Sequence, residues 1–208
     1  MTNPNIPKTR QIKLCVSGAA ETSHCGPRAY EVAKELGREI ARQGAALNTG
    51  ATTGFPLWAA IGAHEAGGQS IGFSPAASER EHTEAYRLPI DYMDLLVYTG
   101  FGYSGRDLIL THSSDGILFG CGRIGTIHEF TTAFEDNKPI GILQGEWTMD
   151  ETLKTILERS NRSYNKVVFD TNPHDLVAKV MELVKKDQIE NKMTYSARPT
   201  EEDGVVHG

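Results

Sequence analysis

The segment 106–129, RDLILTHSSDGILFGCGRIGTIHE, constrains the fold of this chain more than any other part of it. The apolar run Gly116–Phe119 is typical of a strand buried on both faces, and the Ser-Ser-Asp sequence before it ends a predicted helix. Gly120, Gly122 and Gly125 then allow a tight turn and a close approach of the backbone to a ligand. The segment therefore predicts helix, buried strand, glycine-rich turn and second helix.

Two polar side chains after the turn are candidates for chemistry. Thr126 can cap the second helix, whose free N–H groups would point at an anion. Glu129 lies one turn into that helix, where it is a poor partner for phosphate but can reach a sugar or a developing positive charge.

Two more loops of small residues follow predicted strands at 12–16 and 45–49. Backbone N–H groups and hydroxyls at the start of a helix make an anion site plausible. The alternatives are a plain strand-to-helix turn for the first loop and tight helix–strand packing for the second. The candidate phosphate-binding residues in these loops are Ser17, Gly18, Gly50, Thr52, Thr53 and Gly54.

Strands and helices alternate along the chain, with further strands predicted at 69–73, 94–99, 139–143 and 166–169. This alternation predicts an α/β fold: a doubly wound, mostly parallel sheet with helices on both faces. We expect one Rossmann-like domain over residues 1–186, ending in an amphipathic helix at 175–186. Residues 187–208 are polar and are expected to form a mobile tail.

Two loops are candidates for covering a ligand. The polar segment 77–91 is predicted to connect strands over the sheet ends, and 100–105 is predicted to be a flexible loop that delivers Arg106. Phe101 or Tyr103 in the second loop either stacks on a base or packs the loop down. Three side chains of the first loop are expected to be solvated surface: Arg80, His82 and Arg87.

The composition excludes several classes of protein. A formal net charge of −6 over 208 residues argues against general nucleic-acid or acidic-membrane binding. No apolar run is long enough to cross a membrane, and the N-terminus lacks the apolar core of a signal peptide. Cys15, Cys25 and Cys121 show no zinc spacing and suit a reducing cytoplasm. We expect a cytoplasmic protein without a metal.

The glycine turn resembles the hallmark P-G-G-x-G-T-x-x-E of the LOG ("lonely guy", lysine decarboxylase-like) family. The Gly-Thr-x-x-Glu half is intact, and Arg106 lies 23 residues before Glu129, as in the family. Cys121 replaces the proline, Arg123 replaces the second glycine, and Asp107 replaces the lysine that follows the family's arginine. The resemblance covers about the first three-quarters of the chain.

The resemblance implies strand order 3-2-1-4-5-6-7, a homodimer and a phosphoribohydrolase that needs no cofactor. Such an enzyme cleaves the N-glycosidic bond of a nucleoside 5′-monophosphate. Glu129 would stabilise the developing cation or attack C1′, and Arg106 would position Glu129 or the nucleotide. A purely structural salt bridge between Arg106 and Glu129 is the alternative. The phosphate would be held by Gly122, Gly125 and Thr126, while Arg123 would either add a contact or block the space. No lysine is placed to carry pyridoxal phosphate, so a decarboxylase is rejected.

A second hypothesis is a non-catalytic binding protein, because the same superfamily includes proteins that resemble nucleotide sensors and molybdenum-cofactor carriers. It rests on the altered residues Asp107, Cys121 and Arg123. A scaffold protein is a third reading, which leaves the glycine loops unexplained. Release of a product would distinguish the first hypothesis from the second.

Overall fold

A seven-stranded parallel sheet organises the computed structural model, which describes residues 10–196. The strand order is β4-β3-β2-β1-β5-β6-β7, and every neighbouring pair is parallel. The central strands are buried on both faces, as the apolar runs predict. The strands are β1 (Lys13–Ser17), β2 (Ala46–Thr49), β3 (Ser70–Ser74), β4 (Leu95–Tyr98), β5 (Gly116–Phe119), β6 (Ile140–Leu143) and β7 (Val167–Asp170).

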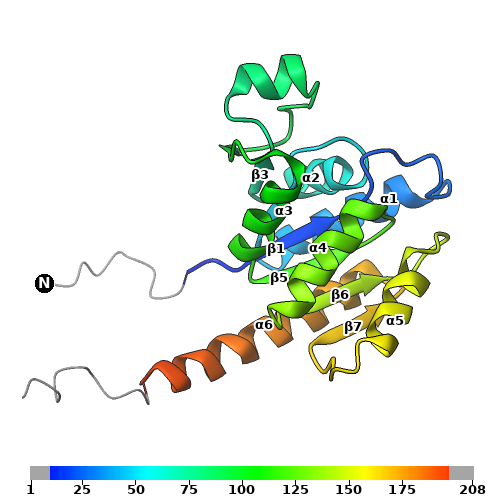
Figure 1. Ribbon diagram of the computed structural model, residues 1–208, viewed down its shortest axis with the longest axis vertical. Helices are drawn as coiled ribbons and strands as arrows, with labels where there is room; N and C mark the ends of the chain where they lie inside the picture. Colours follow the sequence, from blue (N-terminus) through cyan, green and yellow to red (C-terminus); the bar gives the residue numbers. More distant parts are fainter. Residues whose placement is uncertain (1–9, 197–208) are drawn as a thin grey trace, which may run out of the picture.

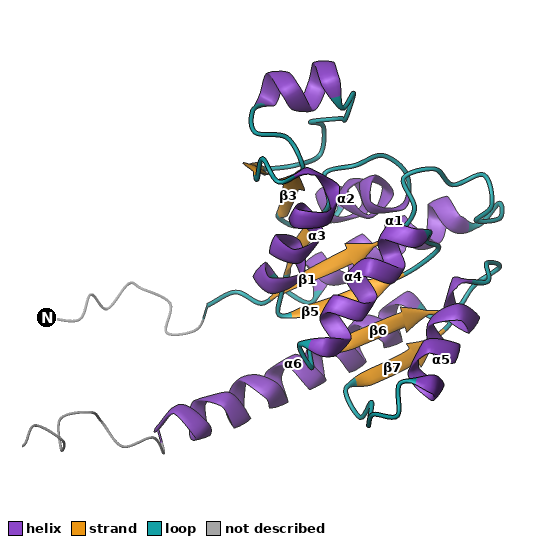
Figure 2. Cartoon of the chain, in the orientation of Figure 1, coloured by secondary structure: helices purple, strands orange, loops and turns teal. Residues whose placement is uncertain are grey.

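Helices cover both faces of the sheet (Figures 1 and 2). On one face α1 contacts both α2 and α6, and on the other face α3 packs on α4. The predicted doubly wound α/β class is therefore confirmed. The helices are α1 (Ala29–Arg42), α2 (Phe55–Glu65), α3 (Gly102–Ser113), α4 (Ile124–Glu135), α5 (Met149–Arg159) and α6 (Pro173–Ser196), with a short π-helix η1 (Glu81–Ala85).

The position of one strand differs from the expected order. The runs 3-2-1 and 5-6-7 are as predicted, but β4 lies at the sheet edge beside β3 instead of between β1 and β5. Its half-exposed side chains fit an edge position, whereas β5 is fully buried and pairs directly with β1. The strand order therefore reverses between β1 and β5, which places the expected ligand crevice there.

Close packing of α1 on α2 depends on two glycines that face each other's helices. A Cβ at Gly37 would collide with the carbonyl of Ala59, and a Cβ at Gly62 would collide with the carbonyl of Lys34. Because backbone atoms block both positions, neither helix can accept a larger residue without moving away from its partner.

Gly62→Ala is expected to destabilise the protein by about 1–3 kcal/mol, because overpacking outweighs the better helix propensity of alanine. Urea denaturation would measure the change. Gly125→Ala is the matched control, since Gly125 is also helical but has open space around its Cβ position. Equal stability of the two variants would contradict the packing argument.

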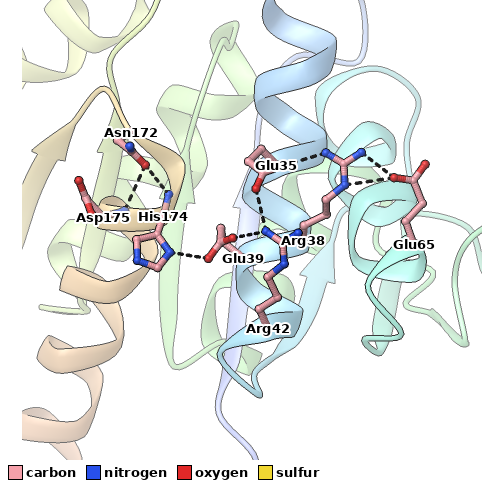
Figure 3. A network of polar contacts seen from close by, with 8 residues as sticks. All are labelled: Glu35, Arg38, Glu39, Arg42, Glu65, Asn172, His174 and Asp175. Carbon is pink, nitrogen blue, oxygen red and sulfur yellow. Dashed lines mark hydrogen bonds and ion pairs between the residues drawn. The ribbon is translucent and has the colours of Figure 1, made fainter.

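A polar network ties α6 to α1 and α1 to α2 (Figure 3). Glu39 of α1 lies 2.7 Å from His174 Nδ1 on α6 and accepts a hydrogen bond from Arg42. Arg38 of α1 donates at 2.7 Å to Glu65 at the end of α2. These charged contacts fix the three helices on the face of the sheet that lies opposite α3 and α4.

Two connecting segments differ from their predicted form. The segment 77–91 contains η1 and projects beyond the sheet in Figure 1. His82 is fully buried rather than solvated, because its ring nitrogens contact the Ser74 hydroxyl at 2.8 Å and the Pro89 carbonyl at 2.9 Å. The expected loop at 100–105 is shorter, since α3 begins at Gly102 and carries Arg106 on a helix.

The last helix is longer than its sequence pattern indicates. It continues through Ser196, so residues 187–196 of the expected tail are helical, and 197–208 lie outside the described residues. The buried apolar side chains from Leu176 to Val184 lie in its first half, which is why a periodicity argument stops at 186. Within residues 10–196, none of the helices is both long and apolar enough to span a membrane.

Candidate functional site

A cavity of about 470 Å³ opens where the carboxyl ends of β1 and β5 meet. Its walls come from the loop after β1, the loop after β2, the start of α3 and the first turn of α4. This is the reversal point of the strand order, and the volume lies in the range that small-molecule sites occupy. The cavity is therefore the candidate ligand site.

The glycine-rich turn brings the N-terminus of α4 to the cavity. Helix α4 begins at Ile124, so Arg123 takes the cap position, which was predicted for Thr126. The Thr126 hydroxyl accepts a hydrogen bond from the Arg123 N–H at 3.3 Å instead of capping the helix itself. The first-turn N–H groups have no partner within a helix, and the helix dipole makes this end attractive to an anion.

The floor of the cavity holds one buried cation between two buried acids. Arg106 Nε lies 3.2 Å from Asp107 Oδ1, and Arg106 Nη1 lies 3.8 Å from Glu129 Oε1. None of the three side chains is more than 10% exposed. Glu129 also accepts a hydrogen bond from the Ser17 hydroxyl, and His128 Nδ1 lies 3.0 Å from Asp107 on the outer side.

Gly50 leaves room for the guanidinium at this floor. A Cβ at position 50 would overlap the terminal nitrogens of Arg106, so only glycine permits this position of the arginine. Arg106 Nε has no hydrogen-bond partner among the described residues, although Asp107 is close. A buried donor without an acceptor is costly, so the floor is suited to a ligand that supplies one.

Burial changes the acidity of Glu129 at the cavity floor. Desolvation raises the pKa of Glu129 to about 7; Arg106 opposes this shift, and the neighbouring Asp107 adds to it. Glu129 is therefore divided between its neutral and ionised forms near neutral pH. A carboxyl group in this state can donate or accept a proton at the cavity floor.

The structure brings most of the predicted site residues to the cavity wall. The predicted residues that line it are Ser17, Gly18, Gly50, Thr52, Arg106, Arg123, Gly125, Thr126 and Glu129. Three other predicted residues do not line it: Thr53, Gly54 and Gly122. The Thr53 hydroxyl donates a hydrogen bond to the Ala20 carbonyl, and the N–H of Phe55, which follows Gly54, donates to the Ala19 carbonyl. This part of the loop after β2 therefore packs against the loop after β1. A Cβ at Gly122 would meet the Thr126 side chain.

Sequence reasoning missed some contributors to the cavity. Asp107 and Glu21 line it, and of the two predicted aromatic contacts only Tyr103 does, whereas Phe101 is 70% exposed. The acidic replacement at position 107 was the available signal for Asp107. From the segment 77–91 no residue reaches the wall, and Arg80 pairs with Glu84 at 2.9 Å instead.

One pair of cysteines forms a disulfide, which differs from the expectation that the cysteines suit a reducing cytoplasm. Cys25 and Cys121 form a disulfide between the loop before α1 and the glycine turn, with Cα atoms 5.6 Å apart, while Cys15 stays free and buried. The two partners are 96 residues apart in sequence, so spacing alone gave no signal for the pair.

Comparison with protein-family models identifies the chain. The model described as the SLOG cluster4 family matches residues 11–177, which include every strand and the whole cavity. The chain belongs to the SLOG cluster4 family. The predicted membership of the wider LOG-like superfamily is thereby confirmed.

Relatives of this SLOG cluster4 protein include solved structures whose ligand is named. A molybdenum cofactor binding protein from Rippkaea orientalis is 28% identical, with a TM-score of 0.67 over 85% of this chain and 97% of the other. A molybdenum cofactor carrier protein from Chlamydomonas reinhardtii is 29% identical, with a TM-score of 0.69 over 85% and 99%. An uncharacterized protein from Archaeoglobus fulgidus is 29% identical over 133 residues, which are 64% of this chain and 82% of that one.

Proposed function

We propose that this SLOG cluster4 protein binds a phosphorylated pterin-type molecule and acts as a carrier of the molybdenum cofactor or a similar pterin. The observation that carries the proposal is the cavity floor, where two carboxyl groups flank one guanidinium that lacks a hydrogen-bond acceptor at Nε. The similarity to carriers at 28% and 29% identity supports it.

The floor is chemically matched to one edge of a pterin ring. That edge presents adjacent N–H donors beside a carbonyl acceptor. Carboxylates can accept hydrogen bonds from the N–H groups, and a guanidinium can donate to the carbonyl. Asp107 and Glu129 would take the N–H groups, and Arg106 would take the carbonyl. The cofactor's phosphate would then lie at the first turn of α4, where N–H groups and the exposed Arg123 attract an anion.

Binding and return of the intact cofactor would test the carrier function. The full chain is mixed anaerobically with molybdenum cofactor released from a molybdoenzyme, separated by gel filtration and assayed for bound pterin. We expect one pterin per chain, recovered unchanged. Asp107→Asn should weaken binding about 10- to 100-fold, because a charged hydrogen bond is lost. Glu158→Gln, at an exposed site on α5, is the control. Failure to retain pterin would refute the proposal.

A second candidate is hydrolysis of a nucleoside 5′-monophosphate, favoured by the Arg106–Glu129 pair at the floor. Cleavage of an N-glycosidic bond passes through an oxocarbenium-like state, which an ionised Glu129 would stabilise. Incubation with AMP, GMP, CMP, UMP and a cytokinin monophosphate, followed by chromatography, would reveal free base. Formation of free base by the wild type, but not by Glu129→Gln, would establish the hydrolase and replace the carrier assignment.

The homodimer stays a prediction, to be tested by the mass of the full chain in solution.

A further inference from the structure

A cluster of two sulfurs and one imidazole lies beside the cavity and has no part in the proposed function. Cys25 and Cys121 form the disulfide that joins the loop before α1 to the glycine turn. His24 is next to them, and the three candidate ligand atoms lie within 4.8 Å of one another. Both sulfurs are buried, whereas the imidazole is exposed. Thiolates and imidazole are ligands that zinc prefers.

The imidazole already stands at a metal-binding distance from both sulfurs. His24 Nε2 lies 3.5 Å from Cys121 Sγ and 3.9 Å from Cys25 Sγ. Tetrahedral zinc with its usual bond lengths places sulfur and nitrogen ligands about 3.6 Å apart and two sulfurs about 3.8 Å apart. For a zinc ion to fit, the two bonded sulfurs have to separate, and His24 Nε2 has to give up its 3.2 Å contact with the Gly122 carbonyl oxygen.

A carboxylate stands behind the imidazole, as in many zinc sites. His24 Nδ1 lies 3.7 Å from Glu21 Oε2, so the nitrogen that faces away from the sulfurs points toward an acceptor. At 3.7 Å this contact is longer than a hydrogen bond, and His24 Nε2 lies 3.2 Å from the Gly122 carbonyl oxygen. On metal binding, Glu21 would accept a hydrogen bond from Nδ1–H, which leaves Nε2 as the metal ligand. Glu21 also lies 3.8 Å from Arg123 and lines the ligand cavity.

We propose that Cys25, Cys121 and His24 form a redox-gated zinc site that is closed by the disulfide and opened by reduction. A dithiol reductant supplies two electrons and two protons, the sulfur–sulfur bond breaks to give two cysteine thiols, and the reductant becomes a disulfide. Each thiol then releases a proton to water as it binds zinc, and a water molecule takes the fourth position. In the reverse step a disulfide oxidant accepts two electrons from the thiolates and two protons from water and becomes a dithiol, the Cys25–Cys121 bond re-forms, and the zinc ion is released.

The site is coupled to the cavity through the glycine turn. The Cys121 carbonyl accepts a hydrogen bond at 2.7 Å from the N–H of Ala19, which lines the cavity. Glu21 connects the imidazole to Arg123 at the cavity rim. Exchange of the disulfide for a metal would therefore act on the two loops that hold the pocket ligand, whichever ligand that is.

Metal titration of the full chain in its two redox states tests the proposal without any variant. Disulfide-containing protein and protein reduced with a dithiol, which is then removed anaerobically, are titrated with Co²⁺ and then with Zn²⁺. We expect the reduced form alone to bind one ion per chain, with thiolate-to-cobalt charge-transfer absorption that Zn²⁺ abolishes. Absence of that absorption from reduced protein with two accessible thiols would overturn the proposal.

Variants assign the ligands. Cys121→Ser and Cys25→Ser should each lower zinc affinity at least 100-fold, and His24→Ala should lower it at least 10-fold. Cys15→Ala is the matched control, because Cys15 is a buried cysteine outside the cluster, and it should bind zinc like the wild type. Equal zinc affinity of His24→Ala and wild type would overturn the three-ligand site, as would loss of binding in Cys15→Ala alone.

Discussion

Replacement of Arg106 by methionine is expected to destabilise the folded protein by about 3–5 kcal/mol at pH 8, because removing one partner leaves buried charge uncompensated. Asp107 and Glu129 are both buried, and Arg106 is the cation that lies within 4 Å of each. At pH 5 the loss should be smaller, since a Glu129 whose pKa is raised to about 7 is then protonated. Urea denaturation at the two pH values would measure both numbers.

Arg123→Met is the matched control for this experiment. Arg123 is also an arginine of the cavity, but its side chain is 62% exposed and lies 3.8 Å from an exposed acid. Its replacement should change stability by no more than about 0.5 kcal/mol at either pH. If Arg106→Met changed the free energy of unfolding as little as Arg123→Met, the Arg106 guanidinium would not be neutralising the buried acids Asp107 and Glu129.

Glu129→Gln is expected to have the second large effect: it should abolish a loss of stability that the wild type shows as the pH rises. The pKa of Glu129 is raised from 4.5 to about 7 in the folded state, so the folded protein binds a proton more tightly than the unfolded chain. The stabilising contribution is full below pH 4.5 and is lost as the pH rises through 7. A shift of this size corresponds to about 3 kcal/mol.

Unfolding free energies of wild type and Glu129→Gln between pH 4 and pH 9 would test this sign and size. The wild type should lose about 3 kcal/mol more than the variant over that range, because glutamine carries no proton to lose. Glu158→Gln, at an exposed position of α5, should retain the wild-type slope. Parallel curves for wild type and Glu129→Gln would show that Glu129 keeps an ordinary acidity.

The fold class and much of the pocket could be predicted from local patterns. The run Gly116–Phe119 has the composition of a doubly buried strand, and the glycines after it require a turn, so a helix after the turn followed, although its cap is Arg123 rather than Thr126. The strand and the turn depend on neighbours in sequence, which is why the chain alone reveals them. The pairing of Arg106 with Glu129 came from the resemblance to the LOG family, and the two side chains meet at the cavity floor.

The placement of β4 could not be read in this way. Its apolar residues predict a strand but do not say which neighbour it pairs with, and pairing with β3 puts it at the edge. The burial of His82 has the same origin, since Ser74 and Pro89 complete its hydrogen bonds only after the segment has folded back. Both depend on contacts between segments rather than on periodicity.

The sequence by itself determined the alternation of strands and helices, the glycine turn and many of the residues that line the cavity. Tertiary structure decided which charges meet: it placed Asp107 beside Arg106 and Glu129 in a buried floor, where desolvation raises the pKa of Glu129. It also brought Cys25 and Cys121 together across 96 residues. Burial and long-range proximity are properties of the packed chain, so no local pattern encodes them.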